Sequence, residues 1–181
     1  MSEYIYKSVE DLSDIEIQYH GFYALSLMGE GEKIVSLFDK KCDNLRLSYR
    51  SLLEILTHYC GDKSVLYHQL LQSKDEYIVR ICLKQIGKEK RIEFKDDIER
   101  YLDSQSFELQ LDAIRTCGLL ENRHSVEKII TFLDDSRWQI RAIAIEAISR
   151  IGFDGYEDIL IHMLKDKEWQ VRYNCAKYLT R

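Results

Sequence analysis

Proline is absent from the 181-residue sequence, and glycine occurs only eight times. Both residues interrupt helices, proline because it has no backbone N–H to donate and glycine because its backbone is so free. Their scarcity argues against long irregular segments and proline-bounded linkers, and it favours a helical protein. Apolar residues make up 45% and charged residues 31% of the chain, which is typical of folded globular proteins rather than disordered ones.

Signals for export and membrane insertion are missing as well. Residues 1–7 lack the basic start and following apolar run of a signal peptide. No stretch approaches the roughly twenty uninterrupted apolar residues of a membrane-spanning helix. The sequence therefore predicts a cytoplasmic protein that does not enter a membrane.

The cysteines do not form a recognisable framework. There are five of them, an odd number without a Cys-x-x-Cys pair: Cys42, Cys60, Cys82, Cys117 and Cys175. Such a set fits reduced, buried thiols better than disulfides. The alternative is a zinc site with four ligands, Cys42, His58, Cys60 and His68. Their spacing matches no compact metal knuckle, so we predict no metal and no cofactor.

Charge is unevenly distributed along the chain. The formal net charge is −5, and residues 1–36 contain seven acidic but only two basic residues. The remaining residues balance. An acidic chain is a poor match for nucleic acid, whereas its N-terminal end could attract a basic partner.

The sequence contains an internal repeat. Two similar strings, Leu133–Arg141 and Leu164–Arg172, lie 31 residues apart and include Trp-Gln-Ile-Arg and Trp-Gln-Val-Arg. Steps of 30 or 31 residues back from Arg141 reach equivalent positions as far as the N-terminal region. Six repeats result, and their anchor residues are His20, Arg50, Arg80, Gln110, Arg141 and Arg172.

Apolar residues recur at fixed distances from these anchors. The positions three before, one before and three after the anchor are apolar in all six repeats. In the fifth repeat the apolar face comprises Ile140, Ala144 and Ile148, a spacing that follows one side of an α-helix. Polar residues that can cap a helix stand six positions before most anchors: Asp14, Asn44, Ser104, Asp135 and Asp166, with Asp75 substituting in the third repeat, where Lys74 occupies this position.

A shorter helical stretch precedes each cap. Examples are Ser64–Leu71, Ser125–Leu133 and Tyr156–Leu164. Each repeat is thus a helical hairpin, and one hairpin cannot bury its own apolar face although stacked hairpins can. The sequence predicts an all-α fold, a right-handed α-solenoid of about six hairpins, as a single domain over residues 1–181.

These residues resemble the HEAT-repeat superfamily, specifically the short bacterial HEAT-like repeats first described in phycobilin lyases. The family pattern is a leucine, a turn aspartate, Val-Arg, alanines and a closing Ile-Gly. The fifth repeat matches it with Leu133, Asp135, Ile140-Arg141, Ala144, Ala147 and Ile151-Gly152. The resemblance covers the whole chain but is tight only in the last two repeats, and His20 and Gln110 depart from the pattern.

The resemblance implies a non-enzymatic scaffold that binds a protein partner along its concave face, which the second helix of each hairpin would form. Iron-dependent hydroxylases of this superfamily carry His-Glu dipeptides in successive repeats, and no histidine here precedes a glutamate. DNA alkylation-repair solenoids use a basic concave face, which the acidic balance disfavours. A nucleic-acid-binding solenoid and a lyase-type accessory of an enzyme remain the alternatives, although no residue carries the attachment function of the lyases.

Two columns of the repeat are candidates for function. The anchor arginines either bond the turn aspartate and carbonyls of their own or the adjacent repeat, as Arg141 could with Asp135, or form a row of exposed anion receptors. The aromatic column three positions earlier either packs between successive hairpins or forms an apolar groove for a partner. We predict a partner-binding surface formed by Tyr77, Phe107, Trp138, Trp169 and Tyr173, supported by Arg141 and Arg172.

One local basic cluster stands out: Lys84, Lys88, Lys90, Arg91 and Lys95. Glu89 and Glu93 interrupt it, so a solvated turn is the simpler interpretation. Nucleic-acid contact would require further basic residues on the same edge of neighbouring repeats.

The last helix presents an apolar face of Val171, Cys175, Tyr178 and Leu179 close to the C-terminus. Solenoids normally close with an atypical polar cap. The pattern therefore indicates a continuation of the chain, self-association through this face, or a helix that packs only backward.

Overall fold

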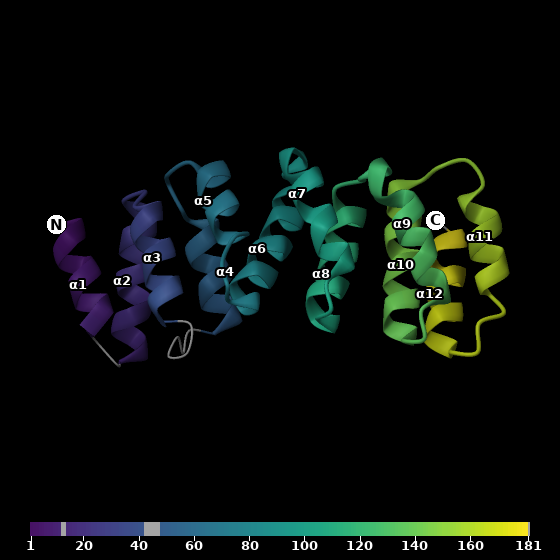
Figure 1. Ribbon diagram of the computed structural model, residues 1–181, viewed down its shortest axis with the longest axis horizontal. Helices are drawn as coiled ribbons and strands as arrows, with labels where there is room; N and C mark the ends of the chain where they lie inside the picture. Colours follow the sequence, from purple (N-terminus) through teal and green to yellow (C-terminus); the bar gives the residue numbers. More distant parts are fainter. Residues whose placement is uncertain (12–13, 42–47, 181) are drawn as a thin grey trace. The chain divides into compact units, whose positions relative to one another are not determined.

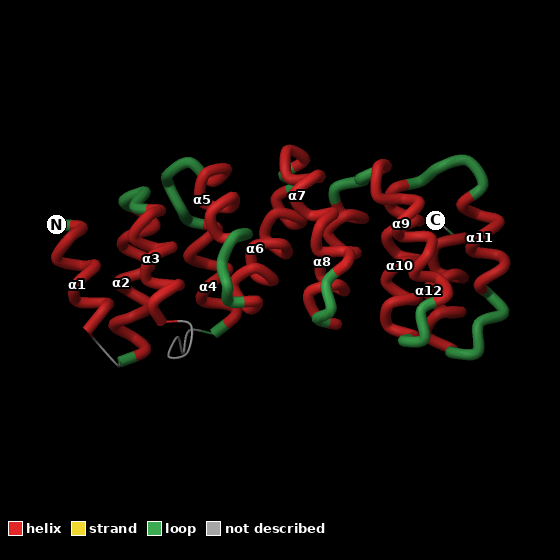
Figure 2. Tube along the Cα trace, in the orientation of Figure 1, coloured by secondary structure: helices red, strands yellow, loops and turns green. Residues whose placement is uncertain are grey.

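The computed structural model describes residues 1–11, 14–41 and 48–180. Their regular structure consists of α-helices and short 3-10 helices, and no strand occurs among these residues (Figure 2). The predicted all-α solenoid class is confirmed. The predicted right-handedness of the stack remains a prediction.

Within the residues described, the helices form six hairpins in chain order (Figure 1). The first helices are α1 (Ser2–Asp11), α3 (Gly31–Lys41), α5 (Lys63–Leu70), α7 (Lys95–Glu99), α9 (Val126–Thr131) and α11 (Tyr156–Met163). The second helices are α2 (Ile15–Leu27), α4 (Tyr49–Thr57), α6 (Glu76–Glu89), α8 (Phe107–Leu119), α10 (Trp138–Ile151) and α12 (Trp169–Leu179). Short 3-10 helices flank α7 and α9: Ile92–Phe94, Arg100–Asp103, Arg123–Ser125 and Phe132–Asp134.

The chain divides into two compact units, residues 1–85 and residues 86–181. We refer to them as the N-terminal unit and the C-terminal unit. Each has its own buried apolar residues, including Phe22, Leu37 and Tyr67 in the first and Ile114, Ala144 and Ile148 in the second. A single domain over residues 1–181 stays a prediction.

In the N-terminal unit, aromatic and backbone contacts join successive hairpins. Phe22 of α2 stacks on Phe38 of α3 with ring centroids 5.0 Å apart. Cys60 donates its backbone N–H to the carbonyl of Ser26 at 2.9 Å, which ties the α4–α5 connection to the end of α2.

In the C-terminal unit, small residues let helices approach closely. A Cβ atom placed on Gly118 of α8 would lie 2.7 Å from Cα of Ala147 of α10, so this contact requires glycine. Helix α10 also packs against α12, and its face of Ile140, Ala144 and Ile148 is fully buried.

The buried faces of α2 and α4 differ from the predicted register. Helix α2 buries Phe22 and Leu25, whereas its predicted anchor His20 is exposed. Helix α4 buries Leu52 and Ile55, and Arg50 is exposed. Both faces lie one residue earlier than the match to α10 requires, which corresponds to about 100° of rotation around a helix. The observed register of α2 and α4 is obtained when the first step back from Gln110 is 31 residues and not 30. The sequence fits both steps because α6 carries two adjacent apolar columns.

Helix starts follow the predicted polar residues with two variations. Asp14 is the N-cap of α2 and accepts the N–H of Glu16 at 2.8 Å, and Asp75 likewise accepts the N–H of Tyr77 at 2.9 Å. In the last two repeats the predicted aspartate closes a turn two residues before the N-cap, as Asp166 does by accepting the N–H of Glu168. Ser106 rather than Ser104 caps α8, Ser48 caps α4, and Asn44 lies outside the described residues.

Candidate functional site

Arg141 joins the fifth hairpin to the sixth. Its Nη1 donates to the carbonyls of Asp135 at 2.7 Å and Ser136 at 3.2 Å. Its Nε and Nη2 bind the two carboxylate oxygens of Asp166 at 2.7 and 2.9 Å. The carboxylate therefore belongs to the next repeat, and Asp135 contributes its carbonyl instead.

The Arg141–Asp166 pair is almost sealed from solvent, with side-chain exposures of 6% and 7%. The hydrogen bonds that Arg141 donates to the carboxylate of Asp166 lower the pKa of Asp166 and raise the pKa of Arg141. Bidentate geometry and burial give this arginine a structural role. This agrees with the interpretation that the anchor arginines bond the turn of their own or the adjacent repeat. Its guanidinium is not accessible to a partner, so we leave Arg141 out of the candidate surface.

The fourth repeat reaches a similar link with different residues. Its anchor Gln110 donates to the carbonyl of Leu102 at 2.8 Å and accepts from Nη2 of Arg137 at 2.7 Å. Arg137 in turn binds Asp135 through Nε at 2.9 Å and Nη2 at 2.6 Å. A glutamine and a second arginine thus replace the direct arginine–aspartate pair.

Arg172 repeats half of the arrangement of Arg141. Its Nη1 donates to the carbonyls of Asp166 at 2.7 Å and Lys167 at 3.0 Å. Nε and Nη2, which hold a carboxylate in Arg141, have no carboxylate partner among the described residues. The guanidinium is half-buried and held in place by its own turn.

The aromatic column is not a uniform surface. Phe107 and Trp138 are half-buried, and the guanidinium of Arg137 lies over the Phe107 ring, 5.5 Å from its centroid. Trp169 is 63% exposed and Tyr173 60% exposed, and their rings meet edge to face at 6.5 Å. Tyr77 lies in the N-terminal unit and is 39% exposed.

The difference between α10 and α12 explains these exposures. In α10, Trp138, Ala142 and Ile145 form a row, hereafter the α10 row, and Ala142 and Ile145 are buried. Helix α12 covers it, with Nδ2 of Asn174 donating to the carbonyl of Ala142 at 3.1 Å.

Trp169, Tyr173 and Ala176 occupy the same positions in α12 and form the α12 row, in which all three residues are exposed. No described residue covers this row as α12 covers α10.

The apolar face predicted to be uncapped is a different one. Val171, Cys175 and Tyr178 are buried, so this face of α12 packs inward on α10 and α11. Of the interpretations of that face, backward packing agrees with the structure.

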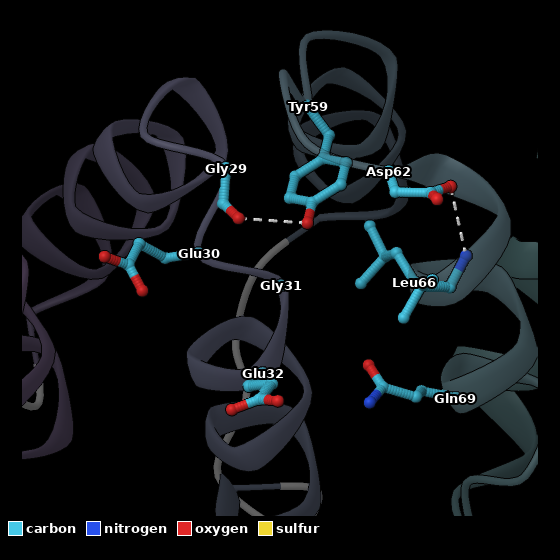
Figure 3. Close-up of a pocket in the computed structure, with 9 residues that line it drawn as sticks. Gly29, Glu30, Gly31, Glu32, Tyr59, Asp62, Leu66 and Gln69 are labelled. Carbon is cyan, nitrogen blue, oxygen red and sulfur yellow. Dashed lines mark hydrogen bonds between the residues drawn. The ribbon is translucent and has the colours of Figure 1, made fainter.

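A pocket of about 340 Å³ opens in the N-terminal unit (Figure 3). The Tyr59 hydroxyl donates to the carbonyl of Gly29 at 3.1 Å across it. Three acids line the pocket, but Asp62 caps α5, and Lys33 lies 3.2 Å from Glu30. Hydrogen bonds from Ser2 and Lys33 lower the pKa of Glu30. Two of the three carboxylates are thus used internally.

The cysteines of the described residues differ in burial and protonation. Burial raises the pKa of Cys117 to about 12 and that of Cys175 to about 11, so both thiols stay protonated. Cys82 is also buried and Cys60 is exposed, whereas Cys42 lies outside the described residues. Among the residues described, no three histidine, cysteine or carboxylate side chains gather in a way that could hold a metal.

The basic cluster is partly neutralised within itself. Nε of Arg91 lies 2.6 Å from Oε1 of Glu93, and Lys95 donates to the carbonyl of Glu121 at 3.3 Å. This arrangement supports the interpretation as a solvated turn. Separately, of the described helices none combines the length and apolarity needed to cross a bilayer.

Two features of this region were not predicted from the sequence. Arg137 stands in for an anchor arginine, and the only available signal was the glutamine at Gln110, which leaves Asp135 without a guanidinium from the preceding repeat. The exposed α12 row was visible as aromatic residues, but its lack of a covering helix was not.

Comparisons with known proteins agree with this architecture. The family model of HEAT repeats matches residues 126–181, which contain the last two hairpins. The crystal structure of an engineered protein from the Northeast Structural Genomics Consortium is similar, with a TM-score of 0.63 and 14% sequence identity over 99% of this chain and 95% of that one. No curated protein shows significant similarity to the sequence. The resemblance to HEAT repeats is therefore confirmed for residues 126–181, and the fold of the chain is similar to that of the engineered protein.

Proposed function

We propose that the protein is a non-catalytic interaction scaffold that binds a protein partner through the C-terminal unit. The observation that carries this proposal is the α12 row beside the half-free guanidinium of Arg172. Exposed Trp169 and Tyr173 rings are costly to leave in water, and tryptophan, tyrosine and arginine contribute most of the binding energy in protein interfaces.

The flanking aromatic residues extend this surface. Trp138 is half-buried in the preceding helix and keeps part of its ring accessible, while Phe107 lies under Arg137. We therefore place the centre of recognition on Trp169, Tyr173 and Arg172, with Trp138 and Phe107 at its edge. Tyr77, in the N-terminal unit, remains a predicted contact.

The test is affinity capture from the native host followed by mass spectrometry. We compare the unaltered chain with a variant carrying Trp169→Ala and Tyr173→Ala, and with Tyr4→Ala as a matched control, since Tyr4 is 78% exposed on α1. Specific partners should be lost only with the double variant, because both rings lie on the surface and their removal leaves the core intact.

Two outcomes would contradict the proposal. One is an identical set of captured proteins in all three samples. The other is a mobility shift with nucleic acid that weakens steeply with salt, since phosphate binding releases counterions. That result would favour the nucleic-acid-binding alternative. Adding Trp138→Ala to the double variant tests whether the rings serve recognition and not folding. The temperature of thermal unfolding of this triple variant should then differ from that of the unaltered chain by only a few degrees.

A further inference from the structure

The two arginines of the last repeats are held in the same way by their own turns. Arg141 Nη1 donates to the carbonyls at positions six and five before it, and Arg172 Nη1 does the same. The shorter bond is 2.7 Å in both cases. Each guanidinium is therefore fixed relative to the helix that carries it.

This anchoring directs the remaining nitrogens. In Arg141 they bind the carboxylate of Asp166, which stands just ahead of the helix that covers the α10 row. In Arg172 the corresponding Nε and Nη2 have no carboxylate among the described residues. A pre-positioned guanidinium loses little rotamer freedom when a carboxylate binds, which makes it a good receptor.

The apolar rows of α10 and α12 differ in the same way as the two arginines, since one is covered and the other is exposed. The α10 row is covered by α12, which places Asn174 against Ala142. The α12 row continues this pattern with Trp169, Tyr173 and Ala176, all exposed. The guanidinium and the row together form one half of an interface whose complete form is present one repeat earlier.

We propose that this face binds an α-helix of a partner protein that is preceded by an acidic turn. The carboxylate of that turn takes the place that Asp166 has on Arg141 and forms a bidentate pair with Nε and Nη2 of Arg172. The helix then lies beside α12 and covers Trp169, Tyr173 and Ala176. This inference rests on the proposed function and specifies the chemistry of its partner.

The continuity of the interface selects this occupant. The element that covers the α10 row is a helix, α12. Asp166 lies in the turn just before this helix, where it accepts the N–H of Glu168 and binds Arg141. An aspartate at the same place before a partner helix is therefore positioned to reach Arg172. A lone anion would leave the aromatic rings uncovered, and a purely apolar segment would leave the guanidinium desolvated without a partner.

The probe is a synthetic peptide of residues 153–181, because it carries both Asp166 and α12. Its dye-labelled form is titrated with the full-length protein and followed by fluorescence anisotropy. We expect Arg172→Gln in the protein to weaken binding at least tenfold, and Asp166→Asn in the peptide to do the same. Combining the two should add little further loss, since they remove one interaction.

Two further variants separate charge from geometry. Arg172→Lys keeps the charge but lacks the planar fork, so binding should still fall severalfold. Lys167→Gln is the matched control, because it removes one positive charge from the same turn without altering the guanidinium, and it should change binding less than twofold. Circular dichroism confirms that each variant is folded.

Four results would overturn the inference. The first is no binding at millimolar peptide. The second is binding that does not depend on Arg172, which indicates that the peptide displaces the protein's own α11–α12 hairpin and pairs with Arg141. The third is sedimentation showing that a second copy of the chain occupies the face. Captured partners that survive Arg172→Gln but not the Trp169 and Tyr173 double variant would refute the inference while leaving the proposed function intact.

Discussion

The N-terminal and C-terminal units contain the same kind of hairpin but connect successive hairpins by different chemistry. In residues 86–181, guanidinium groups bridge neighbouring turns, through Arg141 with Asp166 and through Arg137 with Asp135 and Gln110. In residues 1–85, Tyr59 binds a backbone carbonyl across the turns, and Phe22 stacks on Phe38. One backbone pattern therefore accepts two sets of connecting residues, provided that each buried polar group finds a partner.

The C-terminal unit should be the more sensitive of the two to loss of a single side chain. Arg141→Ala leaves the carboxylate of Asp166 buried without its guanidinium, which should cost about 3–5 kcal/mol in the free energy of unfolding. Urea denaturation measures this change. Arg150→Ala serves as the control, because that arginine forms an exposed pair with Glu146 and should cost well under 1 kcal/mol. Equal losses would show that the pair of Arg141 and Asp166 is not what fixes the C-terminal hairpins.

Close helix contacts offer a second comparison. Gly118→Ala places a methyl group 2.7 Å from a backbone atom of α10, which cannot move aside without shifting the helix, so we expect a loss of about 2 kcal/mol. Gly21→Ala in α2 meets Cγ2 of the buried Val9, a side-chain atom that can shift without moving the backbone of α1. Thermal unfolding should therefore show the larger decrease for Gly118→Ala; the reverse order would place the tighter helix contact in the N-terminal unit.

In the N-terminal unit the expected effect is smaller. Tyr59→Phe removes the hydroxyl that donates to the carbonyl of Gly29 but keeps the ring, so stability should fall by about 1 kcal/mol. Tyr4→Phe, on the exposed surface of α1, is the control and should be neutral. If Tyr59→Phe were as stable as the unaltered chain, packing of the ring alone would hold the α2–α3 connection against the α4–α5 connection.

Acid should weaken the arginine–carboxylate links of the C-terminal unit. Hydrogen bonds from Arg141 and Arg137 lower the pKa values of Asp166 and Asp135 below their ordinary value of 3.8. Their contribution to stability is fully present above that value and is lost as the pH falls through the lowered pKa values, because the unfolded state binds the protons first. The stability of Arg141→Ala, measured by urea denaturation between pH 5 and pH 2, should therefore depend less on pH; an unchanged slope would mean that other carboxylates dominate.

The periodic sequence predicted much of the fold correctly. Ile140, Ala144 and Ile148 were assigned to one apolar face from spacing alone and are buried, since an amphipathic helix must place such a face against its neighbours. For Arg141 the sequence left a structural role and a place on the partner-binding surface open, and its burial with Asp166 selects the structural role. The register of α2 and α4 did not, because two adjacent apolar columns fit the pattern equally well and only packing around Phe22 and Leu52 selects one of them.

The candidate surface was predictable as a set of residues but not as a site. Trp138 and Trp169 have similar sequence surroundings, yet one lies half-buried in a covered helix and the other is 63% exposed. Arg141 and Arg172 likewise share a motif and differ in whether a carboxylate reaches them. Exposure and pairing depend on the neighbouring repeat, which no local pattern encodes.

By itself, the sequence determined the helical class, the hairpins and, outside α2 and α4, the residues that face inward, because helix propensity and apolar periodicity act over one or two turns. Only the tertiary structure decided which carboxylate each guanidinium binds, which helix contact requires glycine and which aromatic rings stay in water. These outcomes arise between hairpins about 30 residues apart, where the close packing of neighbouring helices fixes the partner of each side chain.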